Sequence, residues 1–245
     1  MAGADVIRHR LADISPKAWQ HPADRAATAA LQRIPKLDLV VKRLIEFQYE
    51  RALRQSFLAS SIKLGPKQLP AVWKRYENVL ATLDMPGKYD LYVTQYPLTN
   101  AATIGSKEPI IVLASSVVSV LDEAEIETVL AHEAGHILAD HVMYITALQL
   151  LLRLSVPRLG ITALPFLALQ TALLEWYRAT ELSCDRAATL VNRDPLVTSR
   201  TLMVMAGGAN SRKLAPGRYR FTVRVTASVN PGPPRSLFGA AFRIL

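Results

Sequence analysis

The chain is poor in cysteine and histidine, and each shortage restricts what the protein can be. It holds one cysteine, Cys184, among 245 residues, so no disulfide framework can form within it and a reducing compartment is expected. Only five histidines are present, and none follows His141. A metal site that uses imidazole therefore has to take it from the part of the chain up to His141.

Long apolar segments are also missing. Residues 1–10 are polar and charged, which predicts that there is no signal peptide and that the protein lies on the cytoplasmic side. The most apolar interval, 143–176, is interrupted by Arg153, Pro157 and Arg158. Neither of its two runs reaches the roughly 18–20 residues of a membrane-spanning helix. A helical hairpin in the protein core, a membrane-embedded hairpin and an interfacial patch all fit this interval.

Charge of one sign is in excess, with 29 basic residues against 20 acidic ones and a net charge of +9. The basic residues are scattered and carry no signature of an RNA- or DNA-binding module, so no nucleic-acid partner is predicted. An anionic membrane surface suits this charge better.

The strongest signal that is present is the sequence HEAGH at residues 132–136, inside an apolar stretch of helical periodicity. Residues four apart on an α-helix point to the same side, so His132 and His136 can bind one Zn²⁺ through ring nitrogens. Glu133 is placed to take a proton from a metal-bound water. The motif predicts one zinc ion per chain and metal-assisted hydrolysis of an amide.

A catalytic zinc needs a third protein ligand and an open position for water. His141 would point well away from the ligand side of a continued helix, so it is predicted to lie on the helix surface or behind the ligands. Glu181 is a better candidate, because Asp185 lies one helical turn later on the same side. Glu181 can bind the metal while Asp185 accepts the free ring N–H of a ligating histidine. Cys184 is an alternative ligand, although a small buried thiol is the simpler interpretation.

The order of these motifs resembles that of peptidase family M48, the gluzincin group that includes the bacterial heat-shock membrane protease and the CAAX-processing prenyl-protein protease. The resemblance covers roughly residues 65–210 and rests on HEAGH, on the ExxxD pattern of Glu181 and Asp185, and on the pair Asn100-Ala101. It implies a zinc metalloendopeptidase in which the two histidines of HEAGH and Glu181 bind zinc and Glu133 is the catalytic base.

The resemblance also implies how a polypeptide substrate binds. In the family, the segment that ends in Asn-Ala is an edge strand that receives the substrate backbone, which assigns Asn100 and Ala101 to substrate binding. Family members often place transmembrane helices in the interval that corresponds to 143–176, which favours membrane association. They usually also have a downstream His or Arg that stabilises the oxyanion.

No histidine is available for that oxyanion role in this chain. The group is therefore an arginine, a tyrosine or missing, and the candidate arginines are Arg193, Arg200 and Arg212. A catalytically impaired zinc-binding protein is accordingly one alternative function. A membrane-associated interaction protein is the other.

The predicted fold is α+β and mainly α-helical, a gluzincin-like metalloprotease domain with a small antiparallel sheet beside the HExxH helix. Asp122 and Glu125 match a capping box and predict the start of that helix. We expect an N-terminal helical region over 1–64, the metallopeptidase domain over 65–214 and an atypical Pro/Gly/Arg-rich tail over 215–245. The tail is either a genuine extension or the product of a frameshift.

Overall fold

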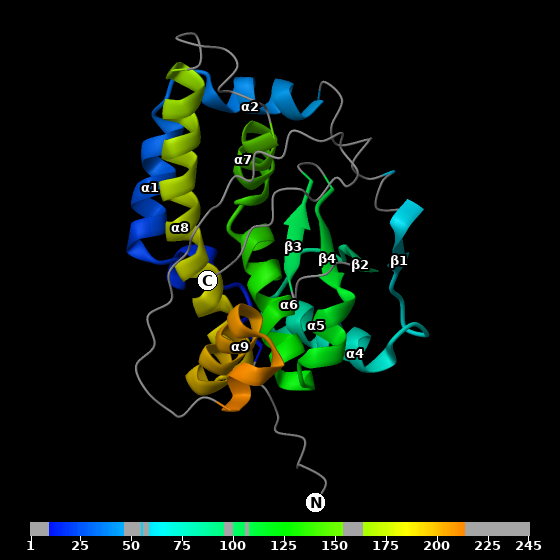
Figure 1. The fold of residues 1–245 in the computed structure, drawn as a ribbon. Coiled ribbons are helices and arrows are strands. Elements are labelled where there is room, and N and C mark those ends of the chain that lie inside the picture. Colours follow the sequence, from blue (N-terminus) through cyan, green and yellow to red (C-terminus); the bar gives the residue numbers. More distant parts are fainter. Residues whose placement is uncertain are drawn as a thin grey trace, which may run out of the picture.

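The computed structural model describes residues 10–46, 55, 59–95, 100–105, 108–153 and 164–213. Within them the chain is mainly α-helical and forms one four-stranded sheet, which confirms the predicted α+β class. Figure 1 shows the sheet on one side of the central helix α6 (Glu123–Leu138) and the long helix α8 (Leu164–Asn192) on the other. The predicted tail over 215–245 lies outside the described residues.

The sheet is mixed, so the prediction of a purely antiparallel sheet is wrong. The strands are β1 (Ser61–Lys63), β2 (Asp90–Thr94), β3 (Ala101–Ile104) and β4 (Ile110–Ala114), in the spatial order β1-β2-β4-β3. After β2 the chain forms β3 at the edge of the sheet, and then β4 between β2 and β3. Strand β4 is antiparallel to β3 and parallel to β2. Gly105, which directly follows β3, adopts a φ of 118° that side chains disfavour.

Helix α6 begins at the predicted capping box. The Asp122 side chain accepts from the backbone N–H of Glu125 at 2.9 Å, and the Glu125 side chain accepts from the N–H of Asp122 at 3.0 Å. The helix ends at Leu138, and Asp140 then adopts a left-handed φ of 57°. His141 therefore lies in a turn that folds back on α6, and not on a continuation of that helix as the sequence reasoning assumed.

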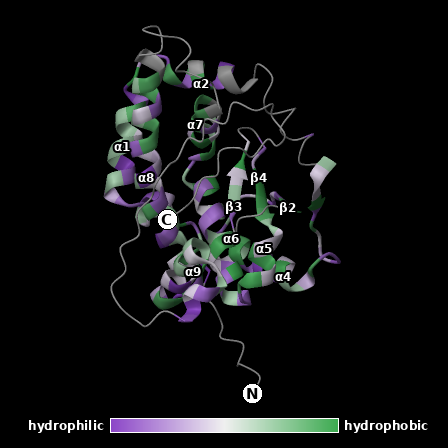
Figure 2. Ribbon diagram, in the orientation of Figure 1, coloured by the Kyte–Doolittle hydropathy of each residue, from purple (hydrophilic) through white to green (hydrophobic). Residues whose placement is uncertain are grey.

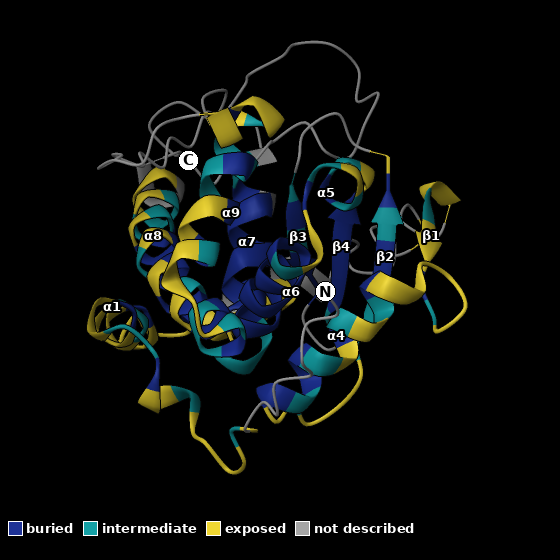
Figure 3. Ribbon diagram, turned by 90° about the horizontal axis from the view of Figure 1, so that it is seen from below, coloured by how far each residue is buried: buried dark blue, intermediate teal, exposed yellow. Residues whose placement is uncertain are grey.

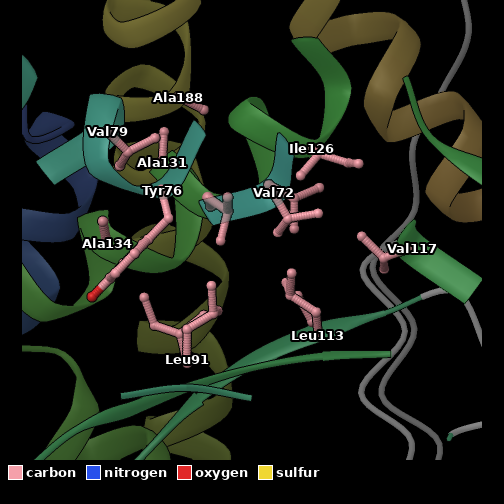
Figure 4. Packing of buried hydrophobic residues seen from close by; sticks show 14 of the residues in the cluster. Val72, Tyr76, Val79, Leu91, Leu113, Val117, Ile126, Ala131, Ala134 and Ala188 are labelled. Carbon is pink, nitrogen blue, oxygen red and sulfur yellow. The ribbon is translucent and has the colours of Figure 1, made fainter. Parts of the chain in front are cut away.

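The central core lies between the sheet and the helices that cover it. Helices α4 (Pro70–Thr82) and α9 (Pro195–Gly207) pack against α6, and α5 (Ser115–Val120) packs against β4. Figure 3 shows that β4 is buried. In Figure 4, Leu91 and Leu113 of the sheet face Val72 and Tyr76 of α4. This core holds α6 rigidly along its apolar side.

A second core explains the apolar interval 143–176. Helix α7 (Val142–Arg153) and the first half of α8 pack against α1 (Pro22–Gln32) and α2 (Leu37–Glu46), as Figures 1 and 2 show. Their shared buried residues include Leu31, Leu148 and Trp176. No helix in the described part of the chain is long and apolar enough to cross a membrane. Of the three interpretations of this interval, packing in the protein core is the one that residues 143–153 and 164–176 fit, and residues 154–163 lie outside the described residues.

Two short 3₁₀ helices complete the described structure, η1 (Pro16–Ala18) and η3 (Ala209–Lys213). The N-cap of α9 is Asp194, whose side chain accepts from the N–H of Leu196 at 2.9 Å.

Candidate metal centre

The two helices that carry the predicted ligands approach each other closely at Gly135. A Cβ atom at Gly135 would lie 3.1 Å from the Cβ of Ala187 and 3.3 Å from the Cα of Cys184. A glycine in the middle of HEAGH therefore lets α8 lie against α6. This contact brings Glu181 of α8 to the histidines of α6.

Three buried donor groups converge there. Glu181 Oε2 lies 3.4 Å from Nε2 of His132, and Glu181 Oε1 lies 3.3 Å from Nε2 of His136. The exposed fractions of these residues are 6% for His132, 4% for His136 and 5% for Glu181. Within the described residues, three of these atoms have no hydrogen-bond partner. They are the two carboxylate oxygens of Glu181 and Nε2 of His132. Buried polar atoms without partners are unusual and call for a ligand or an ion.

The spacing of these atoms fits zinc. In a tetrahedral site with metal–ligand bonds of about 2.0–2.1 Å, two ligand atoms lie about 3.3–3.4 Å apart. The two distances from Glu181 to the histidines match that separation. Two imidazoles and one carboxylate are also a donor set that leaves the fourth position open for water.

The charges of the site suit a cation as well. Burial would raise the pKa of the Glu181 carboxyl, but its interactions with His132 and His136 hold that pKa well below its usual value. Burial would lower the pKa of His132, yet Glu181 and Asp185 raise it well above the ordinary value. Glu181 is therefore ionised, and its negative charge is available to a metal ion.

The second ring nitrogen of each histidine, Nδ1, also has a polar partner. Nδ1 of His132 lies 3.0 Å from Oδ1 of Asp185. Nδ1 of His136 lies 3.3 Å from Nδ1 of His141, which is itself buried. The structure thus brings together His132, His136, Glu181 and Asp185, and adds His141 behind His136.

Cys184 is also near the histidines, and its ligand atom lies within 4.8 Å of theirs. Its Sγ is 3.9 Å from Nδ1 of His141, on the side of His136 that faces away from Glu181. Burial and the charges of Glu181 and Glu133 raise the pKa of its thiol well above the usual value. The Glu181 oxygens lie 3.3–3.4 Å from the two Nε2 atoms, so both Glu181 and Cys184 are candidates for the third ligand.

Glu133 lies next to the donor cluster and is 3% exposed. The hydroxyl of Thr103, on β3, lies 2.7 Å from Oε2 of Glu133 and 3.1 Å from its backbone oxygen. This strand-to-helix contact fixes the direction of the carboxylate. The sequence reasoning missed Thr103, because no local pattern indicates which strand residue will meet a helix that begins twenty residues later.

A small cavity lies beside His132 and Glu133, between α6, α8 and α9. The atoms that line it are mainly apolar, although several of them belong to polar residues. The residues that line it are Thr128, Val129, His132, Glu133, Asp185, Ala188, Thr198, Thr201, Leu202 and Met205. The cavity therefore borders His132 and Glu133 directly.

The strand predicted to bind substrate is at the edge of the sheet. β3 pairs with β4 on one side, with Ala101 opposite Leu113, and it is the last strand of the sheet in the described residues. Asn100 precedes it, and its backbone oxygen accepts from the N–H of Ala114 at 2.9 Å. An edge strand offers unpaired backbone groups to an added chain.

Two of the three arginines considered for oxyanion stabilisation have other partners. Arg200 Nε lies 2.9 Å from Oε1 of Glu125, and Arg212 Nη1 lies 2.9 Å from the same oxygen. Glu125 is about two helical turns before His132, so both arginines are held at the start of α6. Arg193 is exposed.

A tyrosine is close to the site. The ring of Tyr177 stacks parallel to His136, with centroids 6.4 Å apart and an interplanar angle of 4°. Burial and the charges of Glu181 and Glu133 raise the pKa of its phenol well above the usual value, so the hydroxyl keeps its proton. It is a neutral donor at the metal centre.

Comparison with known proteins points to the same chemistry. The model of peptidase family M48 matches residues 66–235, a range that includes part of the predicted tail. The chain is 35% identical over 203 residues to the plastoglobule-localized metallopeptidase 48 of Arabidopsis thaliana, a match that covers 81% of this chain and 58% of that protein. It is 29% identical over 82 residues to a protease HtpX homolog of Tropheryma whipplei, covering 33% and 28% of the two chains. No solved structure matches significantly.

Proposed function

The chain belongs to peptidase family M48, and on that premise we propose that it is a zinc-dependent metalloendopeptidase that hydrolyses peptide bonds in a polypeptide. One observation carries the proposal. Two imidazole nitrogens and a carboxylate converge in a buried site directly beside a second carboxylate, and among the described residues Nε2 of His132 and both oxygens of Glu181 have no hydrogen-bond partner. The chain spans 58% of the length of its plant relative, so the activity of the whole protein is part of the proposal.

His132, His136 and Glu181 would hold one zinc ion per chain. Zinc bound there would lower the pKa of a coordinated water and polarise the carbonyl of the scissile bond. Asp185 accepts the Nδ1–H of His132, which leaves the Nε2 lone pair of that ring free to bind.

Glu133 is the general base in this proposal. Its carboxylate would take the proton of the attacking water and later deliver a proton to the leaving amine. Thr103 holds the carboxylate in one orientation by donating to Oε2. Burial of Glu133 excludes bulk water, so the proton has few alternative acceptors.

Two features would hold the substrate. An extended polypeptide can add to the edge of β3, with Asn100 and Ala101 contacting its backbone, as in β-augmentation. A side chain of that polypeptide can then enter the apolar cavity beside Glu133, between Val129 and Leu202. An apolar residue next to the scissile bond is the preference that these contacts support.

A catalytically impaired zinc-binding protein is the second candidate. It is favoured by the positions of Arg200 and Arg212, which pair with Glu125 instead of facing the donor cluster. Tyr177 is the group that could replace them as the oxyanion donor, because its hydroxyl stays protonated near Glu181. Association with an anionic membrane surface is a separate proposal, which rests on the net charge of +9.

Elemental analysis and a cleavage assay on the purified full chain test the proposal together. We expect one zinc per chain, loss of that zinc in Glu181→Ala, and cleavage of an unfolded polypeptide that a chelator stops and added zinc restores. A wild-type chain that binds no zinc would refute the metal site. A chain that binds zinc but cleaves no unfolded polypeptide would refute the peptidase activity and leave the impaired alternative.

A further inference from the structure

A line of buried contacts runs from the metal centre to the N-terminal helix α1. Nδ1 of His136 lies 3.3 Å from Nδ1 of His141, and Nε2 of His141 lies 3.1 Å from Oδ2 of Asp24. His141 is 1% exposed and Asp24 is fully buried. Asp24 is 117 residues earlier than His141 and outside the range 66–235 that matches the family.

The hydrogen bonds around Asp24 define it as an acceptor. Ser183 Oγ lies 2.6 Å from Oδ2 of Asp24 and also accepts the backbone N–H of His21, at 2.9 Å. Thr28 Oγ1 lies 3.0 Å from Oδ1 of Asp24 and also accepts the indole N–H of Trp176, at 2.9 Å. Because each hydroxyl already accepts from a nitrogen, its own proton points to Asp24.

An acceptor at Asp24 decides the proton positions of the next two rings. Nε2 of His141 must carry a proton to bond with the carboxylate, which leaves a lone pair on its Nδ1 in the neutral ring. Nδ1 of His136 must then donate to that lone pair. The remaining nitrogen of His136, Nε2, is left with the lone pair that faces Glu181.

The surroundings of His141 agree with a lone pair on Nδ1. Sγ of Cys184 also lies 3.9 Å from Nδ1 of His141, and its thiol can donate a weak S–H bond to a lone pair there. Trp176 contacts the ring edge to face, with centroids 5.6 Å apart, which keeps the imidazole plane in place.

We propose that Asp24 and His141 are positioning residues that hold His136 in its Nδ1–H tautomer, the form whose Nε2 binds zinc. Through Asp24, the N-terminal helix α1 thereby contributes to the orientation of a zinc ligand. His132 and His136 are oriented in different ways, the first directly by Asp185 and the second through His141 by a carboxylate on another helix. The proposal rests on the zinc site of the proposed function.

Zinc affinity of the full chain, measured by competition with a chromophoric chelator, is the first test. Asp24→Asn places an amide where the carboxylate was, and its N–H₂ group can donate to His141 and reverse both tautomers. His141→Leu removes the link altogether. Each is expected to raise the zinc dissociation constant about 10–100-fold, the usual effect of losing an orienting partner of a metal ligand.

Leu31→Ala is the matched control, because Leu31 lies on the same helix and is buried in the second core, and its apolar side chain takes no part in the hydrogen bonds of the line. It is expected to lower the stability of the chain while its zinc dissociation constant stays within twofold of wild type. Equal weakening of zinc binding by Leu31→Ala and Asp24→Asn would show a general loosening of α1 and overturn the proposal. Unchanged zinc affinity in folded Asp24→Asn and His141→Leu would also overturn it.

Long-range ¹H–¹⁵N NMR spectra of the wild-type chain with labelled histidine give a second readout, which needs neither zinc nor activity. The account predicts that His141 carries its proton on Nε2 and none on Nδ1, with and without zinc. A proton on Nδ1 of His141 would overturn the proposal even if both variants fail to fold. If the chain binds no zinc but His141 shows the predicted tautomer, the zinc site fails and the hydrogen-bonded line stands.

Discussion

The hydroxyl of Thr103 on β3 donates to Oε2 of Glu133 on α6 at a distance of 2.7 Å. This bond joins the edge strand of the sheet, where a substrate can add, to the proposed general base. The same strand would also contact the substrate. The position of β3 would therefore determine where both the bound peptide and the Glu133 carboxylate lie.

Thr103→Val removes the hydroxyl and keeps the size of the side chain. We expect kcat to fall about 10-fold, because the carboxylate loses the bond that orients it, while zinc content stays at the wild-type value. Steady-state cleavage of a fluorogenic peptide and metal analysis measure the two effects. Thr103→Ser, which keeps the hydroxyl, should recover most of the rate. A Thr103→Val enzyme with wild-type kcat would show that this bond plays no part in turnover.

Leu202→Phe narrows the apolar cavity beside Glu133. We expect kcat/KM for peptides with a large apolar residue next to the scissile bond to fall about 10–200-fold more than for peptides with alanine there. Leu196→Phe is the control, because Leu196 is on the same helix and 76% exposed. Parallel losses for both peptide types would mean that no substrate side chain enters this cavity.

Gly135→Ala places a methyl group between α6 and α8. Its neighbours would lie at 3.1 Å and 3.3 Å, so α8 has to move back by a few tenths of an ångström. We expect a loss of about 1–3 kcal/mol in the free energy of unfolding and weaker zinc binding, because Glu181 moves with α8. Gly87→Ala, where nothing lies within 4 Å, should change neither quantity. Chemical denaturation and chelator competition measure them, and wild-type zinc affinity in Gly135→Ala would refute the role given to this contact.

Tyr76→Phe tests the packing of α4 on the sheet. The hydroxyl of Tyr76 donates to the backbone oxygen of Tyr89 at 2.5 Å and accepts from the backbone N–H of Tyr89 at 2.8 Å. Removing the hydroxyl leaves both backbone groups of Tyr89 without this hydrogen-bond partner. We therefore expect the free energy of unfolding to fall by about 1–3 kcal/mol, with zinc affinity unchanged. Tyr89→Phe keeps those backbone groups in place and should have a smaller effect. Equal stability of Tyr76→Phe and wild type would contradict this assignment.

The same hydroxyl makes a pH-dependent contribution. Burial raises the pKa of Tyr76 from 10.0 to about 12 in the folded chain. Folding thus favours the neutral phenol over the phenolate. The contribution of this group to the free energy of unfolding is complete below pH 10 and is lost as the pH rises towards 12. The difference in stability between wild type and Tyr76→Phe should shrink over that range.

Local patterns were enough to predict much of the centre. The four-residue spacing of His132 and His136, the same spacing of Glu181 and Asp185, and the capping box at Asp122 all depend on helix geometry alone. They hold because each helix keeps its own periodicity whatever surrounds it.

The parts that could not be predicted depend on contacts between distant segments. Thr103 meets Glu133 across a strand-to-helix contact, and Asp24 reaches the site from α1 through His141. The position of His141 also depended on one backbone angle, at Asp140, that ends α6 early. The parallel pairing of β2 with β4 follows from the return of the chain after β3, which side-chain alternation does not reveal.

In the proposed mechanism, Glu133 performs proton transfer at a zinc site held by His132, His136 and Glu181. The most direct measurement compares wild type with Glu133→Gln in cleavage of an unfolded polypeptide, with the zinc content of both proteins determined in the same preparations. We predict one zinc per chain in both proteins, clear cleavage by wild type, and a rate lower by at least about 10²-fold in Glu133→Gln. Cleavage by zinc-loaded Glu133→Gln at the wild-type rate would contradict the account.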